Sequence, residues 1–127
     1  MKTLNNYIMA SSLCALGDSL VTGQKFGLDP QTMIDVLNVG TVVNFPTMDT
    51  FRRDTLPRTF NSGFGLGLLV KDLGICEEFM AHNKFETQLP GMYGECDSLL
   101  HQGYSSMLTS LLSRCPPRLP VRFSQAC

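Results

Sequence analysis

Hydrophobic residues recur at helical spacing along most of the chain, and no segment of useful length alternates apolar and polar residues. The residues from Lys2 to about Phe26 are mostly helix formers and include no proline. Their apolar positions at mostly helical spacing are Leu4, Ile8, Leu13, Leu16 and Leu20, and those on other sides are Ala10, Cys14, Ala15 and Val21. The pattern predicts one long helix, buried on more than one face and almost 40 Å long at about 1.5 Å per residue.

A second helix is predicted after Gly27. Asp29 is a suitable N-cap, and Pro30 suits the first helical position because its missing N–H needs no partner there. The apolar side of this helix is Met33, Ile34, Val36 and Leu37. Gly40 is expected to end it.

Two more helices are predicted, one before residue 61 and one after it. Between Thr41 and Asn61 we predict one short helix with loops on both sides, because Pro46 and Pro57 bracket a few apolar residues. Ser62 is expected to cap a helix over Phe64 to Asn83. Its apolar stripe, in which residues are spaced by four, three and four positions, is Leu69, Leu73, Cys76 and Met80.

In the remaining third of the chain, the sequence pattern predicts two shorter helices and a tail. Pro90 opens a helix through Met92, Cys96, Leu99 and Leu100, and another runs over Tyr104 to Leu112. Three prolines at 116, 117 and 120 prevent the last helix from continuing. The expected fold is therefore all-α, a bundle of about six helices built on the long N-terminal one. We expect residues 1–113 to form the domain and residues 114–127 an irregular Pro-rich tail.

Composition narrows the class of protein. The 127 residues carry a net charge of −1 and are 43% hydrophobic, which suits one small globular domain and falls short of most two-domain cofactor enzymes. The 10 basic and 11 acidic residues form no block of like charge, so neither nucleic acid nor an anionic membrane is an expected partner. The longest uncharged run near the start, Thr3 to Gly17, is too short and polar to span a membrane.

Cysteine and histidine use points to a cytoplasmic protein without a metal centre. The five cysteines are odd in number, far apart and without a C-x-x-C spacing, so we expect reduced, mostly buried thiols. The start of the chain also lacks a small-x-small cleavage site. With only His82 and His101 present, no metal site is predicted.

The first candidate for chemistry is the pair Lys2 and Asn6, four residues apart on one face of the first helix, with Met9 and Leu13 continuing that face inward. An ammonium beside an amide at the edge of apolar surface can form the polar corner of a pocket. A lysine placed there suits general acid–base catalysis, because burial favours its neutral form. The alternative is an ordinary solvated lysine.

The second candidate is the segment from Asn61 to Leu73, where Gly63, Gly65 and Gly67 alternate around a helix start. Glycine is costly inside a helix, so their presence indicates that something approaches the backbone closely. The spacing is not that of a dinucleotide fingerprint, and no strand precedes it. Lys71 is expected to share a helix face with Phe64, and the alternative for Lys71 and Asp72 is a solvated ion pair.

Taken together, these motifs resemble one family. K-x-x-N-N at residues 2–6, G-L-D-P at 27–30 and F-x-x-x-L-x-x-K-D-L at 64–73 are similar to the C-terminal helical domain of the β-hydroxyacid dehydrogenases. That family includes 3-hydroxyisobutyrate dehydrogenase, and its helical domain is of the 6-phosphogluconate dehydrogenase C-terminal type. The resemblance covers about residues 1 to 112 in the right order and spacing.

The resemblance implies roles for individual residues. Lys2 would be the catalytic acid/base for hydride transfer between a short 3-hydroxy acid and NAD or NADP. Asn6 would orient the substrate, and Lys71 would reach the cofactor, with Phe64 near it. Gly65 and Gly67 would let this helix start approach the cofactor closely. Because an apolar face is expected to be exposed where a Rossmann domain would dock, we also expect a homo-oligomer, such as a dimer, formed through the first helix.

Three features depart from the family pattern. The sequence holds no Rossmann domain, which in the family binds most of the dinucleotide; Asp18 stands where glutamate is more usual, and the residues after Ser113 resemble nothing in the family. We therefore expect this chain alone to bind cofactor weakly and to show no turnover. The alternative interpretation is a non-catalytic helical oligomerisation module.

Overall fold

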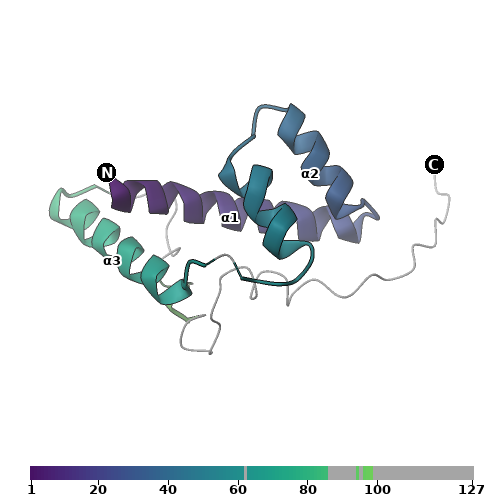
Figure 1. Ribbon diagram of the computed structural model, residues 1–127. Helices are drawn as coiled ribbons and strands as arrows, with labels where there is room; N and C mark the ends of the chain where they lie inside the picture. Colours follow the sequence, from purple (N-terminus) through teal and green to yellow (C-terminus); the bar gives the residue numbers. More distant parts are fainter. Residues whose placement is uncertain (62, 86–93, 95, 99–127) are drawn as a thin grey trace.

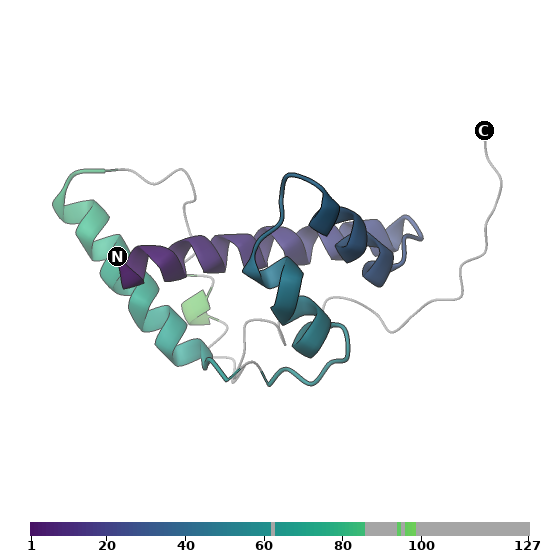
Figure 2. The ribbon, with the colours of Figure 1, turned by 45° about the horizontal axis from the view of Figure 1, so that its top comes forward.

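The computed structural model describes residues 1–61, 63–85, 94 and 96–98. Its elements, in chain order, are α1 (Lys2–Lys25), α2 (Pro30–Val39), η1 (Pro46–Thr55) and α3 (Leu66–His82). Helix α1 is the central rod: α3 crosses it near its N-terminus, while α2 and η1 pack together against its C-terminal half (Figure 1 and Figure 2). The described residues form helices and no strands, which confirms the all-α prediction.

Helix α1 ends at Lys25, next to the predicted boundary, and Gly27 makes the following turn with φ at 84°. Its core side chains are Ala10, Leu13, Leu16 and Leu20. The prediction that Leu4 and Ile8 belong to the buried stripe is wrong: they are 41% and 65% exposed. The first two turns instead direct Asn6 and Ala10 inward.

Helices α1 and α2 meet closely at Gly23. A Cβ atom there would collide with the thioether of Met33, so a larger residue at position 23 would require the Met33 side chain to move. The predicted start of α2 is confirmed. The carboxylate of Asp29 accepts from the backbone N–H of Thr32 at 2.9 Å, and Pro30 is the first helical residue.

A short helix lies between residues 41 and 61, as predicted, but it is of the wide π type. The N–H of Leu56 donates to the carbonyl of Phe51 at 2.8 Å, five residues back. Phe51 is fully buried and joins η1 to the core. The side-chain amide of Asn38 donates to the carbonyl of Thr47 at 3.0 Å, which ties α2 to η1.

Helix α3 begins two residues later than predicted, and its N-cap is Gly65, not Ser62. Gly63, with φ at 75°, and Gly65, with extended backbone, keep the preceding residues out of the helix. Phe64 therefore cannot share a helix face with Lys71, and that prediction is wrong. The apolar stripe is confirmed: Leu69, Leu73 and Cys76 are buried and Met80 is partly buried.

The C-terminal predictions fall almost wholly outside the described residues. Residues 94 and 96–98 are helical, which agrees with a helix opened by Pro90, and Cys96 is in the core. The predicted helix over residues 104–112 and the tail over residues 114–127 lie outside them.

Candidate functional site

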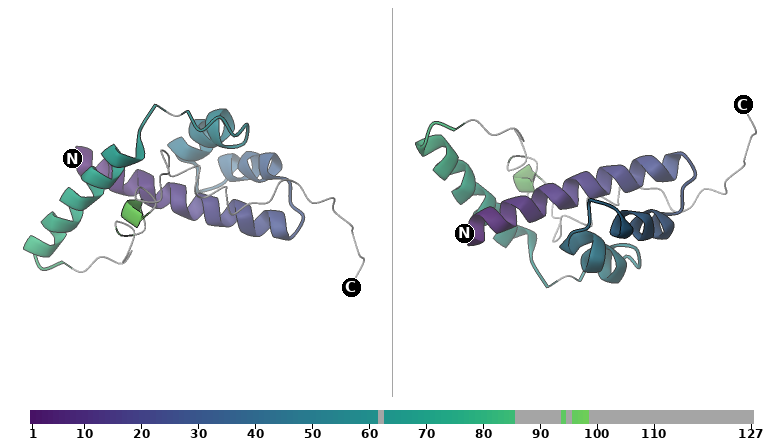
Figure 3. Two further views of the ribbon diagram at one scale, coloured as in Figure 1. Left: turned by 90° about the horizontal axis from the view of Figure 1, so that it is seen from below. Right: turned by 90° about the horizontal axis from the view of Figure 1, so that it is seen from above.

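A buried polar contact joins α1 to α3 near the N-terminus of α1. The side-chain amide Nδ2 of Asn6 donates to Oδ2 of Asp72 at 2.6 Å. Both residues are buried, at 7% and 6% exposure, although each lies on a helix whose other inward residues are largely apolar or small. Figure 3 shows from two further sides that α3 crosses α1 at this end of the molecule. The crossing brings together two predicted motifs that lie far apart in the sequence.

Two lysines interact with the Asp72 carboxylate. The ammonium of Lys71 lies 3.1 Å from Oδ1 of Asp72, and the charge of Lys2 acts on the same carboxylate. The hydrogen bond from Lys71, followed by that from Asn6, lowers the pKa of Asp72 below its ordinary value despite its burial. Of the four predicted site residues, Asn6 and Lys71 therefore contact this carboxylate, and Lys2 acts on it through its charge alone.

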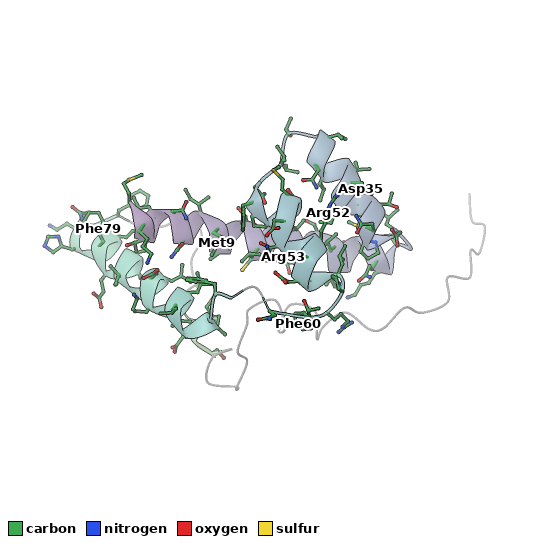
Figure 4. The ribbon with its side chains drawn as sticks, viewed as in Figure 1. Met9, Asp35, Arg52, Arg53, Phe60 and Phe79 are labelled. Atoms are coloured by element: carbon green, nitrogen blue, oxygen red, sulfur yellow. The ribbon has the colours of Figure 1, made fainter. Side chains whose placement is uncertain are left out.

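The lysines themselves face outward. Lys2 is exposed, and the side chain of Lys71 is 59% exposed. The alternative of an ordinary solvated Lys71–Asp72 pair is wrong for its acidic partner, since the Asp72 side chain is only 8% exposed. The predicted inward continuation of the Lys2–Asn6 face is confirmed, because Met9 is partly buried and Leu13 fully buried (Figure 4).

Phe64 and the glycines near it are placed differently from the prediction. Phe64 is partly buried and packs against the core just before α3 begins. Gly65 is not closely packed within this chain: a Cβ atom built there would meet nothing within 4 Å. Gly67 is exposed. Gly65 and Gly67 therefore lie on the exposed side of the start of α3, while Leu66, its first residue, is buried.

The donor set at this crossing suits a nicotinamide dinucleotide and an anionic substrate. The exposed ammonium groups of Lys2 and Lys71 outnumber the single carboxylate of Asp72. The remaining positive charge can attract phosphates or a substrate carboxylate. The first turn of α3 has no side-chain cap, so its N–H groups can also face an anion. Lys71, exposed on α3, is the residue here that could hold such a cofactor.

A second group of charged side chains lies away from this crossing. Arg52 pairs with Asp35, and Arg53 with Asp49 and Asp54, at the α2–η1 end of the molecule (Figure 4). Among the residues that the structure describes, no three His, Cys, Asp or Glu side chains gather as a metal site. None of the described helices has the length and apolar character needed to cross a membrane.

The cysteines agree with the prediction as far as they are described. Cys14, Cys76 and Cys96 carry reduced thiols, the last two buried, and burial raises the pKa of the Cys76 thiol. This keeps Cys76 protonated and unreactive. Cys115 and Cys127 lie outside the described residues.

Sequence reasoning missed Asp72 as a member of the site. It appeared only as one half of a charge pair, because an acidic residue next to a lysine is usually on the surface. The available signal was its position between Val70 and Leu73 on the buried face of the predicted helix, three residues after Leu69 and four before Cys76.

Comparison with known proteins identifies the family of this chain. Residues 1–108 match a family model described as the NAD-binding domain of NADP-dependent 3-hydroxyisobutyrate dehydrogenase. Human mitochondrial 3-hydroxyisobutyrate dehydrogenase is 29% identical over 113 residues, which cover 84% of this chain and 31% of the human protein.

Two further relatives match shorter stretches. The 2-(hydroxymethyl)glutarate dehydrogenase of Eubacterium barkeri is 28% identical over 78 residues, 61% of this chain and 26% of that protein. A probable 3-hydroxyisobutyrate dehydrogenase-like protein of Arabidopsis thaliana is 32% identical over 75 residues, 59% of this chain and 22% of that protein. The chain thus spans about a third or less of the length of these relatives. With its helical fold and a family match over most of its length, it belongs to the family of the C-terminal NAD-binding domain of 3-hydroxyisobutyrate dehydrogenases.

Proposed function

We propose that this chain supplies the lysine-bearing side of the active site of an NAD(P)-dependent dehydrogenase that acts on a short 3-hydroxy acid. The observation that carries the proposal is the meeting of Lys2, Asn6 and Lys71 around the buried Asp72 carboxylate. These residues come from the two motifs that resemble the family.

In this proposal Lys2 is the acid/base. When a substrate hydroxyl is oxidised, its proton passes to the amine of Lys2; when a carbonyl is reduced, the ammonium of Lys2 returns a proton to the oxygen. The bound nicotinamide takes up or supplies the hydride. Asn6 orients the substrate by hydrogen bonding from a fixed amide on the adjacent turn of α1.

Lys71 binds the anionic cofactor in the same proposal. Its ammonium is exposed and stands on α3, whose open N-terminus lies on the same element. Phe64, packed just before that helix, provides an apolar surface near it.

Catalysis in this proposal also needs a Rossmann domain, because the chain supplies only one side of the cleft. We expect the 127-residue chain alone to bind NADPH weakly and to show no turnover. The decisive experiment joins the Rossmann domain of the human relative to residue 1 and follows nicotinamide absorbance with 3-hydroxyisobutyrate and related 3-hydroxy acids.

Lys2→Ala should lower kcat in that fusion by about 100-fold or more, the usual size of a general acid–base contribution. Lys25→Ala, which removes an exposed lysine from the other end of α1, is the matched control and should leave kcat unchanged. Equal activity of Lys2→Ala and the unsubstituted fusion would refute the proposal, as would a folded fusion that binds NADPH and reduces none of the substrates.

A second candidate function is the non-catalytic oligomerisation module. It is favoured by the exposure of Leu4 and Ile8 on the outer side of α1. Sedimentation of the 127-residue chain tests it. Self-association that Ile8→Gln abolishes, together with an inactive fusion, would favour the module over the enzyme domain.

A further inference from the structure

We propose that Asp72 is the positioning residue of this site: its carboxylate fixes the Asn6 amide with one oxygen and the Lys71 ammonium with the other. The inference rests on the proposed function and deepens it. It assigns a role to a residue that the sequence motif treats only as the neighbour of a lysine.

The burial of Asp72 is the first argument. A carboxylate transferred from water to the inside of a helix interface is costly unless it is paired and hydrogen-bonded. An apolar side chain would pack there without that cost, since the neighbouring inward residues Leu69 and Leu73 are apolar. Residue 72 is nevertheless a carboxylate. It contacts Asn6 and Lys71 and interacts electrostatically with Lys2.

The second argument concerns the direction of the Asn6 amide. An ionised carboxylate only accepts hydrogen bonds, so it must be the Nδ2 end of Asn6 that faces Asp72. The Oδ1 end is then turned toward α1, where it accepts a hydrogen bond from Asn5 at 3.5 Å. Asp72 thus decides which end of the amide is donor and which is acceptor, and a substrate meets Asn6 with that polarity fixed.

The third argument is the pairing across helices. Asn6 belongs to α1 and Lys71 to α3, and one carboxylate binds both. The distance between the substrate-orienting amide and the cofactor-binding ammonium is therefore set by two bonds to one rigid group. On η1, Arg53 pairs in the same way with its buried neighbour Asp54, at 2.8 Å, away from this site; the additional bond of Asp72 to Asn6 is what joins two helices.

A double-mutant cycle in the Rossmann fusion tests the role. Asp72→Asn keeps the shape of the side chain and removes its charge and its strict acceptor character. It should lower kcat by about tenfold or more alone, and by less than about twofold in an Asn6→Ala background, because the two residues act as one unit. Asp54→Asn is the matched control and should leave kcat unchanged. Equal losses in both backgrounds would overturn the inference.

A spectroscopic measurement on the 127-residue chain separates this inference from the proposed function. The side-chain amide signals of Asn6 in a ¹H–¹⁵N spectrum should move as Asp72 is titrated with acid, and Asp72→Asn should abolish that movement. Signals that ignore Asp72 overturn the inference even if the fusion is active. An inactive fusion whose Asn6 signals still follow Asp72 refutes the proposed function and leaves the contact structural, which also removes the positioning role.

Discussion

The amide of Asn6 donates to the carboxylate of Asp72 at 2.6 Å, joining two residues that lie 66 positions apart. This contact lies where α3 crosses the N-terminal end of α1 (Figure 3). It is a polar contact in a helix interface whose other buried residues are largely apolar. It therefore links the packing of the domain to the residues proposed for its chemistry. Its consequences can be measured in stability as well as in activity.

Asp72 should make stability depend on pH in the acid range. Its pKa is lowered in the folded protein, first by the hydrogen bond from Lys71 and then by that from Asn6, so the unfolded chain takes up the proton first as pH falls. The stabilisation is fully present above about pH 4, the ordinary pKa of an aspartate, and is lost as pH falls through the lowered folded-state pKa.

Urea unfolding at a series of pH values below neutrality measures this effect. The groups that act on Asp72 are Lys71 and Asn6, through hydrogen bonds, and Lys2, through its charge. Asp72→Asn should therefore flatten the acid limb of the stability curve. An unchanged slope in Asp72→Asn would show that other carboxylates account for the acid limb.

Lys71→Met should act on cofactor affinity more than on the chemical step. In the Rossmann fusion we expect the KM for NADPH to rise about tenfold, the loss of one charge-assisted contact, while kcat changes less. Lys25→Met, at the far end of α1, provides the control. A fall in kcat with an unchanged KM would place Lys71 at the reacting atoms instead of at the cofactor.

Most of the fold could be predicted from the sequence because its helix signals are local. Asp29 followed by Pro30 marks the start of α2, and the spacing of Leu69, Leu73 and Cys76 marks the buried face of α3. These signals depend on neighbours within one turn. They need no knowledge of what the helix packs against.

The parts that failed depend on tertiary packing. The burial of Asn6 in place of Leu4 and Ile8 follows from the position at which α3 crosses α1, which no local pattern specifies. The π form of η1, in which Phe51 is fully buried, likewise has no signal in the local sequence pattern. The sequence motifs named Lys2, Asn6 and Lys71 as candidates. The Asp72 carboxylate was missed because its contact with Asn6 joins two helices, and the packing of α3 on α1 cannot be inferred from local sequence.

Leu20→Ala should strongly destabilise the domain. Leu20 is 1% exposed in the core of α1, and removing a fully buried leucine side chain costs about 2–5 kcal/mol, because a cavity remains. Val36→Ala, at a position 62% exposed on α2, is the matched control and should change the free energy of unfolding by less than about 0.5 kcal/mol. Chemical denaturation of the 127-residue chain measures both, and similar losses in the two variants would contradict this core.

Asp29→Ala should remove the N-cap of α2 and lower the free energy of unfolding by about 1 kcal/mol, because the N–H of Thr32 loses its acceptor. Asp29→Ser should restore most of the loss, since a serine hydroxyl also caps a helix. Asp18→Ala, which removes an exposed carboxylate from the middle of α1, controls for the change in net charge. If Asp18→Ala costs as much as Asp29→Ala, or if serine rescues nothing, the effect comes from charge and not from the cap, and α2 owes its start to Pro30 alone.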